Sequence, residues 1–141
     1  MAVHDEGYAW MDIRIDEARS PQVLELRFSG RVDTRLIDDL ISDVLAEPET
    51  RPRHWIVDTT LATVDFASSE LAALASRIAH SCREQRRYRI HVIASEPSNF
   101  GCMRMLAAHL DGSNIRISVH ENRDEALDEL AVVDPSEQAR R

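Results

Sequence analysis

Two carboxylates and two hydroxyls form the first group of residues with chemical potential. Asp58 ends a short apolar run, and Asp65 follows it before the adjacent pair Ser68 and Ser69. A small hydrolase could use Asp58 with Ser68 as its nucleophile, but no histidine base is identifiable beside them. Hydrolysis is therefore the least favoured of the functions considered for this sequence. The structural alternatives are an Asx-type turn at Asp58 and serine hydroxyls that satisfy amides in a first helical turn. We therefore predict no catalytic residue and no enzymatic activity.

Histidine and cysteine, the usual transition-metal ligands, are too scattered to predict a metal site. His80 and Cys82 are two residues apart on an expected helix and so point to different faces. Cys102 and His109 could share a face, but two ligands do not make a zinc site. We expect no metal and no cofactor. The histidines occupy positions 4, 54, 80, 91, 109 and 120.

One basic cluster follows the second expected helix, at Arg83, Arg86, Arg87 and Arg89. It could contact an acidic partner or a phosphate-bearing ligand. The alternative is a solvated helix C-terminus, where cations interact favourably with the helix dipole.

Composition excludes several classes of protein. All 17 basic residues are arginine, which excludes Schiff-base enzymes, P-loop nucleotidases and protein kinases, because each class needs a lysine. A formal net charge of −8 argues against nucleic acid as a partner. No apolar stretch approaches the roughly 20 residues of a spanning helix, so no membrane insertion is expected. The first residues lack the features of a signal peptide, and we expect a cytoplasmic protein.

Alternating strand and helix periodicities predict an α/β fold in the order ββαβαβαβα. An N-terminal β-hairpin would precede βα repeats, and helices would cover a mainly parallel sheet with the first strand as its antiparallel edge. We expect a flexible segment over residues 1–10, one domain over 11–133 and a tail over 134–141. The strands are expected at 11–15, 24–28, 55–58, 89–94 and 115–119, and the helices at 34–45, 67–82, 97–110 and 123–131.

Five segments carry a family resemblance: Phe28–Gly30, Trp55–Asp58, Phe66–Leu71, Tyr88–Ala94 and Arg123–Leu127. With this element order, residues 11–132 resemble the STAS domain family, which includes bacterial anti-sigma-factor antagonists and their SpoIIAA-like relatives. The resemblance implies a SpoIIAA-like (STAS) fold and a regulatory role.

The antagonists of this family carry an Asp-Ser-Ser-Gly-Leu motif at the start of the second helix, whose first serine is phosphorylated by a partner kinase. Ser68 takes the place of that serine and Leu71 that of the leucine, which makes Ser68 the phosphorylation candidate. Ala67 and Glu70 stand where the motif has aspartate and glycine. A docking site with or without a phosphoserine switch is therefore left open.

The resemblance implies a non-enzymatic regulator that docks to an anti-sigma kinase-like or sensor protein, with a second copy of the chain as a further candidate partner. The alternative is a module that binds a small apolar or phosphate-bearing ligand near Phe100 and Met103. The expected docking surface comprises Asp58, Asp65, Ser68, Ser69, Glu70 and Leu71.

Overall fold

The structure, a computed structural model, describes residues 10–16, 22–45, 52–81 and 87–131. Its elements follow the predicted order, β1 (Trp10–Asp16), β2 (Val23–Val32), α1 (Thr34–Leu45), β3 (His54–Val64), α2 (Ser68–Ser81), β4 (Tyr88–Ile93), α3 (Pro97–His109), β5 (Ile115–His120) and α4 (Arg123–Ala131). The predicted flexible segment, apart from Trp10, and the predicted tail lie outside the described residues. No helix among the described residues is long and apolar enough to cross a membrane.

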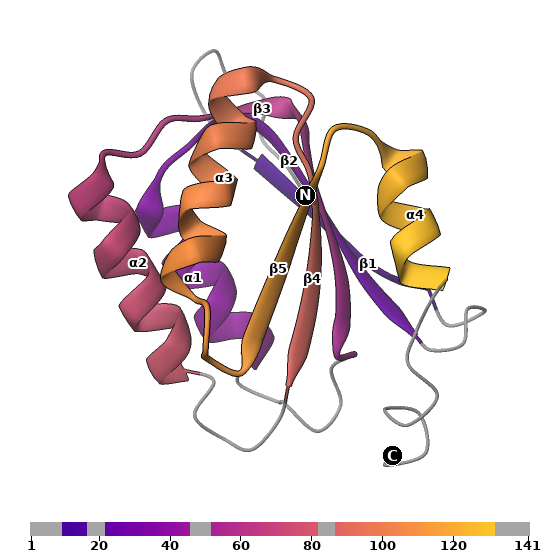
Figure 1. Ribbon diagram of the computed structural model, residues 1–141, viewed down its shortest axis with the longest axis horizontal. Helices are drawn as coiled ribbons and strands as arrows, with labels where there is room; N and C mark the ends of the chain where they lie inside the picture. The colour runs from indigo at the N-terminus through magenta and orange to yellow at the C-terminus, as the bar shows by residue number, and fades with distance from the viewer. Residues whose placement is uncertain (1–9, 17–21, 46–51, 82–86, 132–141) are drawn as a thin grey trace.

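The five strands form one mixed sheet in the order β1-β2-β3-β4-β5. β1 pairs antiparallel with β2, with Ile13 opposite Leu26, and so forms the predicted antiparallel edge. The other pairs, β2–β3, β3–β4 and β4–β5, are parallel. Because parallel crossovers are right-handed and each one advances to the next strand, the connecting helices fall on the same face. Figure 1 shows α1, α2 and α3 on one face of the sheet and α4 on the other.

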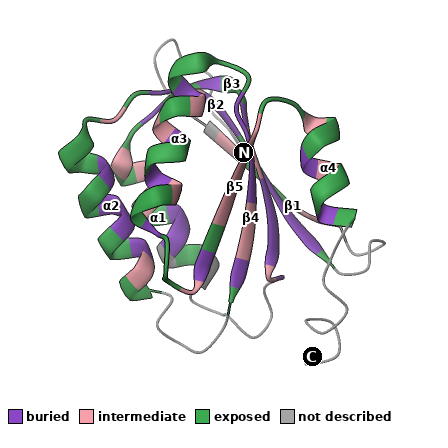
Figure 2. Cartoon of the chain, in the orientation of Figure 1, coloured by how far each residue is buried: buried purple, intermediate pink, exposed green. Residues whose placement is uncertain are grey.

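Each face of the sheet has its own apolar core. The main core combines one side of the strands with α1–α3, and Leu24, Leu26 and Leu74 within it are almost completely buried. The second core lies under α4 and consists of Val23, Ile56, Ile93, Ala126 and Leu130. Strand alternation therefore sends most apolar side chains toward the face with three helices. Figure 2 shows buried residues along the strands and on the helices of both faces.

Helix ends follow the predicted signals. The amide of Leu36 donates to Asp33 Oδ1 at 2.9 Å at the start of α1, and Pro97 begins α3. The amide of Glu125 donates to Asn122 Oδ1 at 2.9 Å before α4. Gly112 follows α3 with a φ of 87°, a left-handed conformation that favours glycine after a helix.

The prediction that the third strand ends at Asp58 is wrong, because β3 continues to Val64. Residues 54–58 pair with both β2 and β4, whereas 61–64 pair with β2 alone after a register shift between Arg27 and Ser29. We call residues 59–64 the β3 extension. The residues after Asp58 are therefore strand and not a free loop.

Candidate functional site

The fully buried side chain of Asn99 holds the β3 extension where β4 no longer pairs with it. Asn99 Oδ1 accepts the amide of Val64 at 2.9 Å, and its Nδ2 donates to the carbonyls of Ala62 at 2.9 Å and Thr59 at 3.3 Å. Thr59 Oγ1 also donates to the carbonyl of Ile93 at 2.7 Å. One α3 side chain thus replaces the missing strand partner and fixes the direction in which the chain enters α2.

The first turn of α2 presents the phosphorylation candidate at the surface. The amide of Leu71 donates to the carbonyl of Ala67 at 3.0 Å, which makes Ala67 the N-cap and Ser68 the first helical residue. Glu70 Oε1 accepts the Ala67 amide at 2.9 Å, the contact that a capping-box glutamate makes. Ser68 and Ser69 lie in the first helical turn, as the sequence predicted, and both are exposed together with Glu70.

Only part of the expected docking surface lies at this turn. Asp65 is exposed in the connection to α2 and joins Ser68, Ser69 and Glu70, a set that we call the α2 entry. Leu71 is 1% exposed and packs in the main core, so its side chain supports the helix from below.

Asp58 lies apart from the α2 entry, on the face of the sheet that α4 covers. Its Oδ2 is 3.6 Å from Arg123 Nη1 at the start of α4, and its Oδ1 accepts the amide of Thr60 at 2.9 Å. The second contact is the Asx-type turn that the sequence predicted for Asp58. The structure therefore brings four of the six expected residues together and separates Asp58 and Leu71 from them.

The thiol of Cys102 on α3 lies near the α2 entry. Burial raises the pKa of Cys102, the negative charges of Asp65 and Glu70 raise it further, and a hydrogen bond with the backbone of Phe66 opposes them. A thiol with a raised pKa is protonated at neutral pH and is a weak nucleophile. The same effect of Asp65 and Glu70 shows that the α2 entry carries a negative potential.

Two residues of the basic cluster, Arg87 and Arg89, lie at the other end of the parallel strands, because they are at the start of β4 whereas the α2 entry follows the end of β3. Arg87, Arg89 and Arg116 line an open pocket of about 230 Å³. Arg116 on β5 was not predicted as part of the cluster, because it is distant in sequence and is brought beside Arg89 only by the pairing of β4 with β5. Arg83 and Arg86 lie outside the described residues.

The region proposed for an apolar ligand is largely filled by the protein itself. Met103 is 5% exposed within the main core, and Phe100 packs against that core. An open depression of about 490 Å³ lies instead between α1 and α2, lined by residues that include Asp38, Ile41 and Arg77. Neither Phe100 nor Met103 lines it.

Charged side chains gather on the α4 face around Glu25, which lies near the start of β2 and is 8% exposed. Arg14 Nη2 donates to Glu25 Oε2 at 3.1 Å, and Arg123 pairs with Oε1. Burial acts to raise the pKa of Glu25, but the hydrogen bonds from Arg123 and Arg14 outweigh it and hold the pKa below its ordinary value. This ion-pair group ties the start of α4 to β1 and β2.

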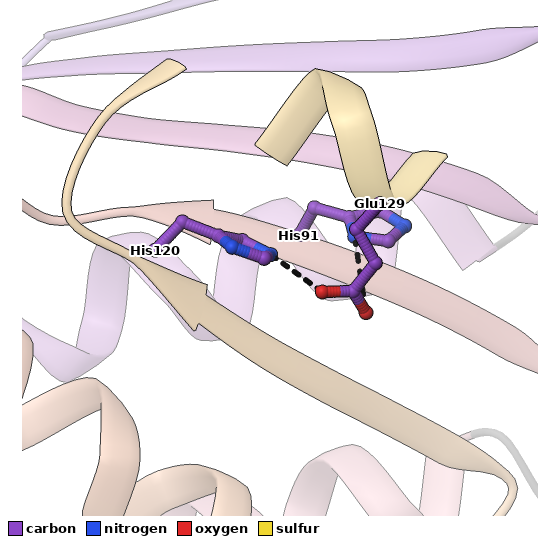
Figure 3. Close-up of side chains that lie close together, drawn as sticks. All are labelled: His91, His120 and Glu129. Carbon is purple, nitrogen blue, oxygen red and sulfur yellow. Dashed lines mark ion pairs between the residues drawn. The ribbon is translucent and has the colours of Figure 1, made fainter. Parts of the chain in front are cut away.

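A second polar group on the same face, His91, His120 and Glu129, was not predicted (Figure 3). His120 Nε2 lies 3.0 Å from Glu129 Oε2, and His91 Nδ1 lies 3.9 Å from Glu129 Oε1. Burial lowers the pKa of His91 to about 4, so its imidazole is neutral at pH 7. Two imidazoles and a carboxylate are a ligand set that transition metals accept.

A signal for this group was present in the strand alternation. Ile90 and Val92 face the main core, so His91 had to face the other side of β4, and the same argument applies to His120 beside Val119 on β5. The prediction of no metal site depended on spacings along single helices, whereas this group combines two neighbouring strands with the helix that follows them.

Comparison with known proteins gives matches in structure alone. No protein-family model matches the chain, and no curated protein sequence matches it. An uncharacterized DUF3478-family protein with a SpoIIAA-like fold, from Shewanella loihica PV-4, superposes with a TM-score of 0.59 at 15% identity, over 91% of this chain and 99% of that one. An anti-sigma factor antagonist from Mycobacterium paratuberculosis gives a TM-score of 0.58 at 14% identity, over 92% and 99%. The predicted SpoIIAA-like (STAS) fold is thereby confirmed.

Proposed function

We propose that this chain is a non-enzymatic regulatory domain that docks to another protein through the α2 entry. The observation that carries the proposal is a set of exposed polar groups, Asp65, Ser68, Ser69 and Glu70, on a rigidly supported helix start. Asn99 supports this region through the β3 extension and Leu71 anchors it in the main core. The likeness to an anti-sigma factor antagonist supports a protein partner of the anti-sigma kinase-like or sensor type.

Charge indicates the chemistry of the contact on the partner. Asp65 and Glu70 make the α2 entry acidic, so a complementary partner surface would carry arginine or lysine. Leu61 in the β3 extension is 74% exposed and offers an apolar side chain at the same end of the sheet. Exposed carboxylates and hydroxyls on a helix start, with an exposed apolar side chain at the same end of the sheet, suit a protein surface better than they suit a small ligand.

Docking through this surface does not require a phosphate on Ser68. Glu70 already accepts the Ala67 amide at the start of the helix, in the region where a phosphate would seek donors. A phosphoserine of charge near −2 would also lie between two carboxylates. We therefore propose a partner that binds the unmodified serine.

The test is affinity capture from cells of the source organism with the wild type, Ser68→Arg, Ser68→Ala and the matched control Ser76→Arg. Ser76 is exposed farther along α2. A protein identified by mass spectrometry should bind the wild type, Ser68→Ala and Ser76→Arg, and lose at least about tenfold in affinity for Ser68→Arg, which places a positive charge and a long side chain between Asp65 and Glu70.

Equal binding by Ser68→Arg and the wild type would show that the α2 entry is not the docking surface. Loss of binding in Ser68→Ala, together with a phosphoryl group on Ser68 in the bound wild type, would replace this proposal with a phosphoserine switch. Far-ultraviolet circular dichroism of each variant verifies that α2 is still folded.

A further inference from the structure

The side chains of the group His91–His120–Glu129 come from β4, β5 and α4. They lie on the face of the sheet that α4 covers, opposite the face that carries α2. One ligand atom from each residue lies within 4.8 Å of the other two. The two imidazole rings are stacked with centroids 6.0 Å apart and an angle of 27° between their planes. The carboxylate of Glu129 reaches both rings from α4 (Figure 3).

His91 is the most informative member because it is buried and, within the part of the chain that the structure describes, has no hydrogen-bond partner. It is 2% exposed, and neither of its ring nitrogens has a hydrogen-bond partner among the described residues. A buried polar group without a partner is costly, and such groups in native proteins call for an explanation such as an ion. His120 Nε2 lies 3.0 Å from Glu129 Oε2, but the two atoms do not meet the geometry of a hydrogen bond, and this nitrogen has no other hydrogen-bond partner among the described residues.

The third ligand is oriented by a neighbour. Ser118 Oγ on β5 donates to Glu129 Oε1 at 2.7 Å, which fixes the carboxylate against the strand. Partners that orient a metal-binding carboxylate in this way are a regular feature of metal sites. The Glu129 side chain is 42% exposed, so a cation can reach the group from the α4 side.

We propose that His91, His120 and Glu129 bind one divalent transition-metal cation, with Zn²⁺ as the reference ion. Two imidazole nitrogens and one carboxylate oxygen form a three-ligand set that leaves a fourth tetrahedral position for water or another ligand. Because an imidazole binds a metal in its neutral form, two imidazoles and one carboxylate give the ligand set a charge of −1, which suits a divalent cation. The ion would join α4 to β4 and β5, and its binding energy would add to the stability of the fold.

The experiment titrates Zn²⁺ into the untagged, metal-free full-length chain, by calorimetry and by competition with a chromophoric chelator. We expect one bound ion per chain and a rise of the unfolding midpoint by about 5 °C or more when free Zn²⁺ is 100-fold above its dissociation constant. Co²⁺ in the same site should give the visible absorption of a tetrahedral centre.

The variants separate this site from other histidines. Glu129→Gln and His91→Gln should each weaken binding by more than about 100-fold, and Ser118→Ala by about tenfold, because it only orients Glu129. His109→Gln is the matched control, because His109 is exposed on α3 and should leave the affinity unchanged. Glu129 is partly exposed, so Glu129→Gln keeps the test valid if His91→Gln fails to fold.

Absence of Zn²⁺ binding by the wild type would overturn the proposal. Binding that Glu129→Gln leaves intact, or that His109→Gln removes, would do the same. The site is independent of the docking proposed for the α2 entry, since neither experiment reads the other surface.

Discussion

The two faces of the sheet differ in how much of their surface is buried by apolar packing and how much carries polar side chains. Among the described residues, twenty buried residues form the main core under α1–α3, whereas only five form the core under α4. The α4 face instead carries the ion pairs of Glu25 and the group His91–His120–Glu129. One face is therefore committed to packing, and the other retains polar side chains that packing does not require.

The difference follows from the topology. Every crossover advances by one strand in the same direction, so three helices must share one face and only a terminal helix is left for the other. A single helix with two buried residues, Ala126 and Leu130, cannot cover five strands. Polar partners and partly exposed charges take the remaining positions.

The largest expected effect contrasts the two cores directly. Leu74→Ala should lower the free energy of unfolding by about 4 kcal/mol, because Leu74 is fully buried in the main core and the surrounding side chains can only partly fill the cavity. Leu130→Ala should cost about 2 kcal/mol, because α4 can shift toward the sheet. Urea unfolding measures both values. Equal costs would show that the second core is as tightly packed as the main one.

Asn99 offers a test of a polar residue placed on the packing face. Asn99→Ala should cost about 3 kcal/mol, since it leaves the Val64 amide and the Ala62 carbonyl buried without their partners. Asn122→Ala is the matched control, an exposed helix cap expected to cost about 1 kcal/mol. Both are read from urea unfolding at equal protein concentration. A cost for Asn99→Ala no larger than that of the cap would mean that the β3 extension does not depend on this side chain.

Local patterns were sufficient to predict most of the fold. Strand alternation and helix caps such as Asp33 and Asn122 depend on interactions between residues close in sequence, so they can be recognised from the sequence alone. The β3 extension was missed because it depends on Asn99, which lies 35 residues from Val64, so no local pattern indicates it.

The candidate sites depend more than the fold does on contacts between residues that are distant in sequence. Ser68 was correctly assigned to a first helical turn, but Asp58 was grouped with it because the two are close in sequence, and strand alternation turns Asp58 toward Arg123. The group His91–His120–Glu129 forms only when β4 pairs with β5 and α4 packs on the face to which His91 and His120 point. Which face α4 covers depends on the arrangement of the whole sheet, so no local pattern predicts it.

The smallest expected effect tests the ion pairs of the α4 face through pH. The folded chain holds the pKa of Glu25 below its ordinary value of 4.5, so its ionised form stabilises the fold. This contribution is fully present above the unfolded pKa and is lost as the pH falls through the folded value. Glu25→Gln should therefore cost about 1–2 kcal/mol at pH 7 and progressively less below about pH 4.5, as urea unfolding across this range would measure.

The control for Glu25 is Asp128→Asn, which removes an exposed carboxylate from α4 and should change stability by less than about 0.5 kcal/mol. If the cost of Glu25→Gln stayed constant from pH 7 to pH 3, the contribution would come from side-chain packing and not from the charge. The α4 face would then resemble the main core in its energetics. A cost that disappears with protonation would show that charge pairing with Arg14 and Arg123 holds α4 to the sheet where apolar packing is thin.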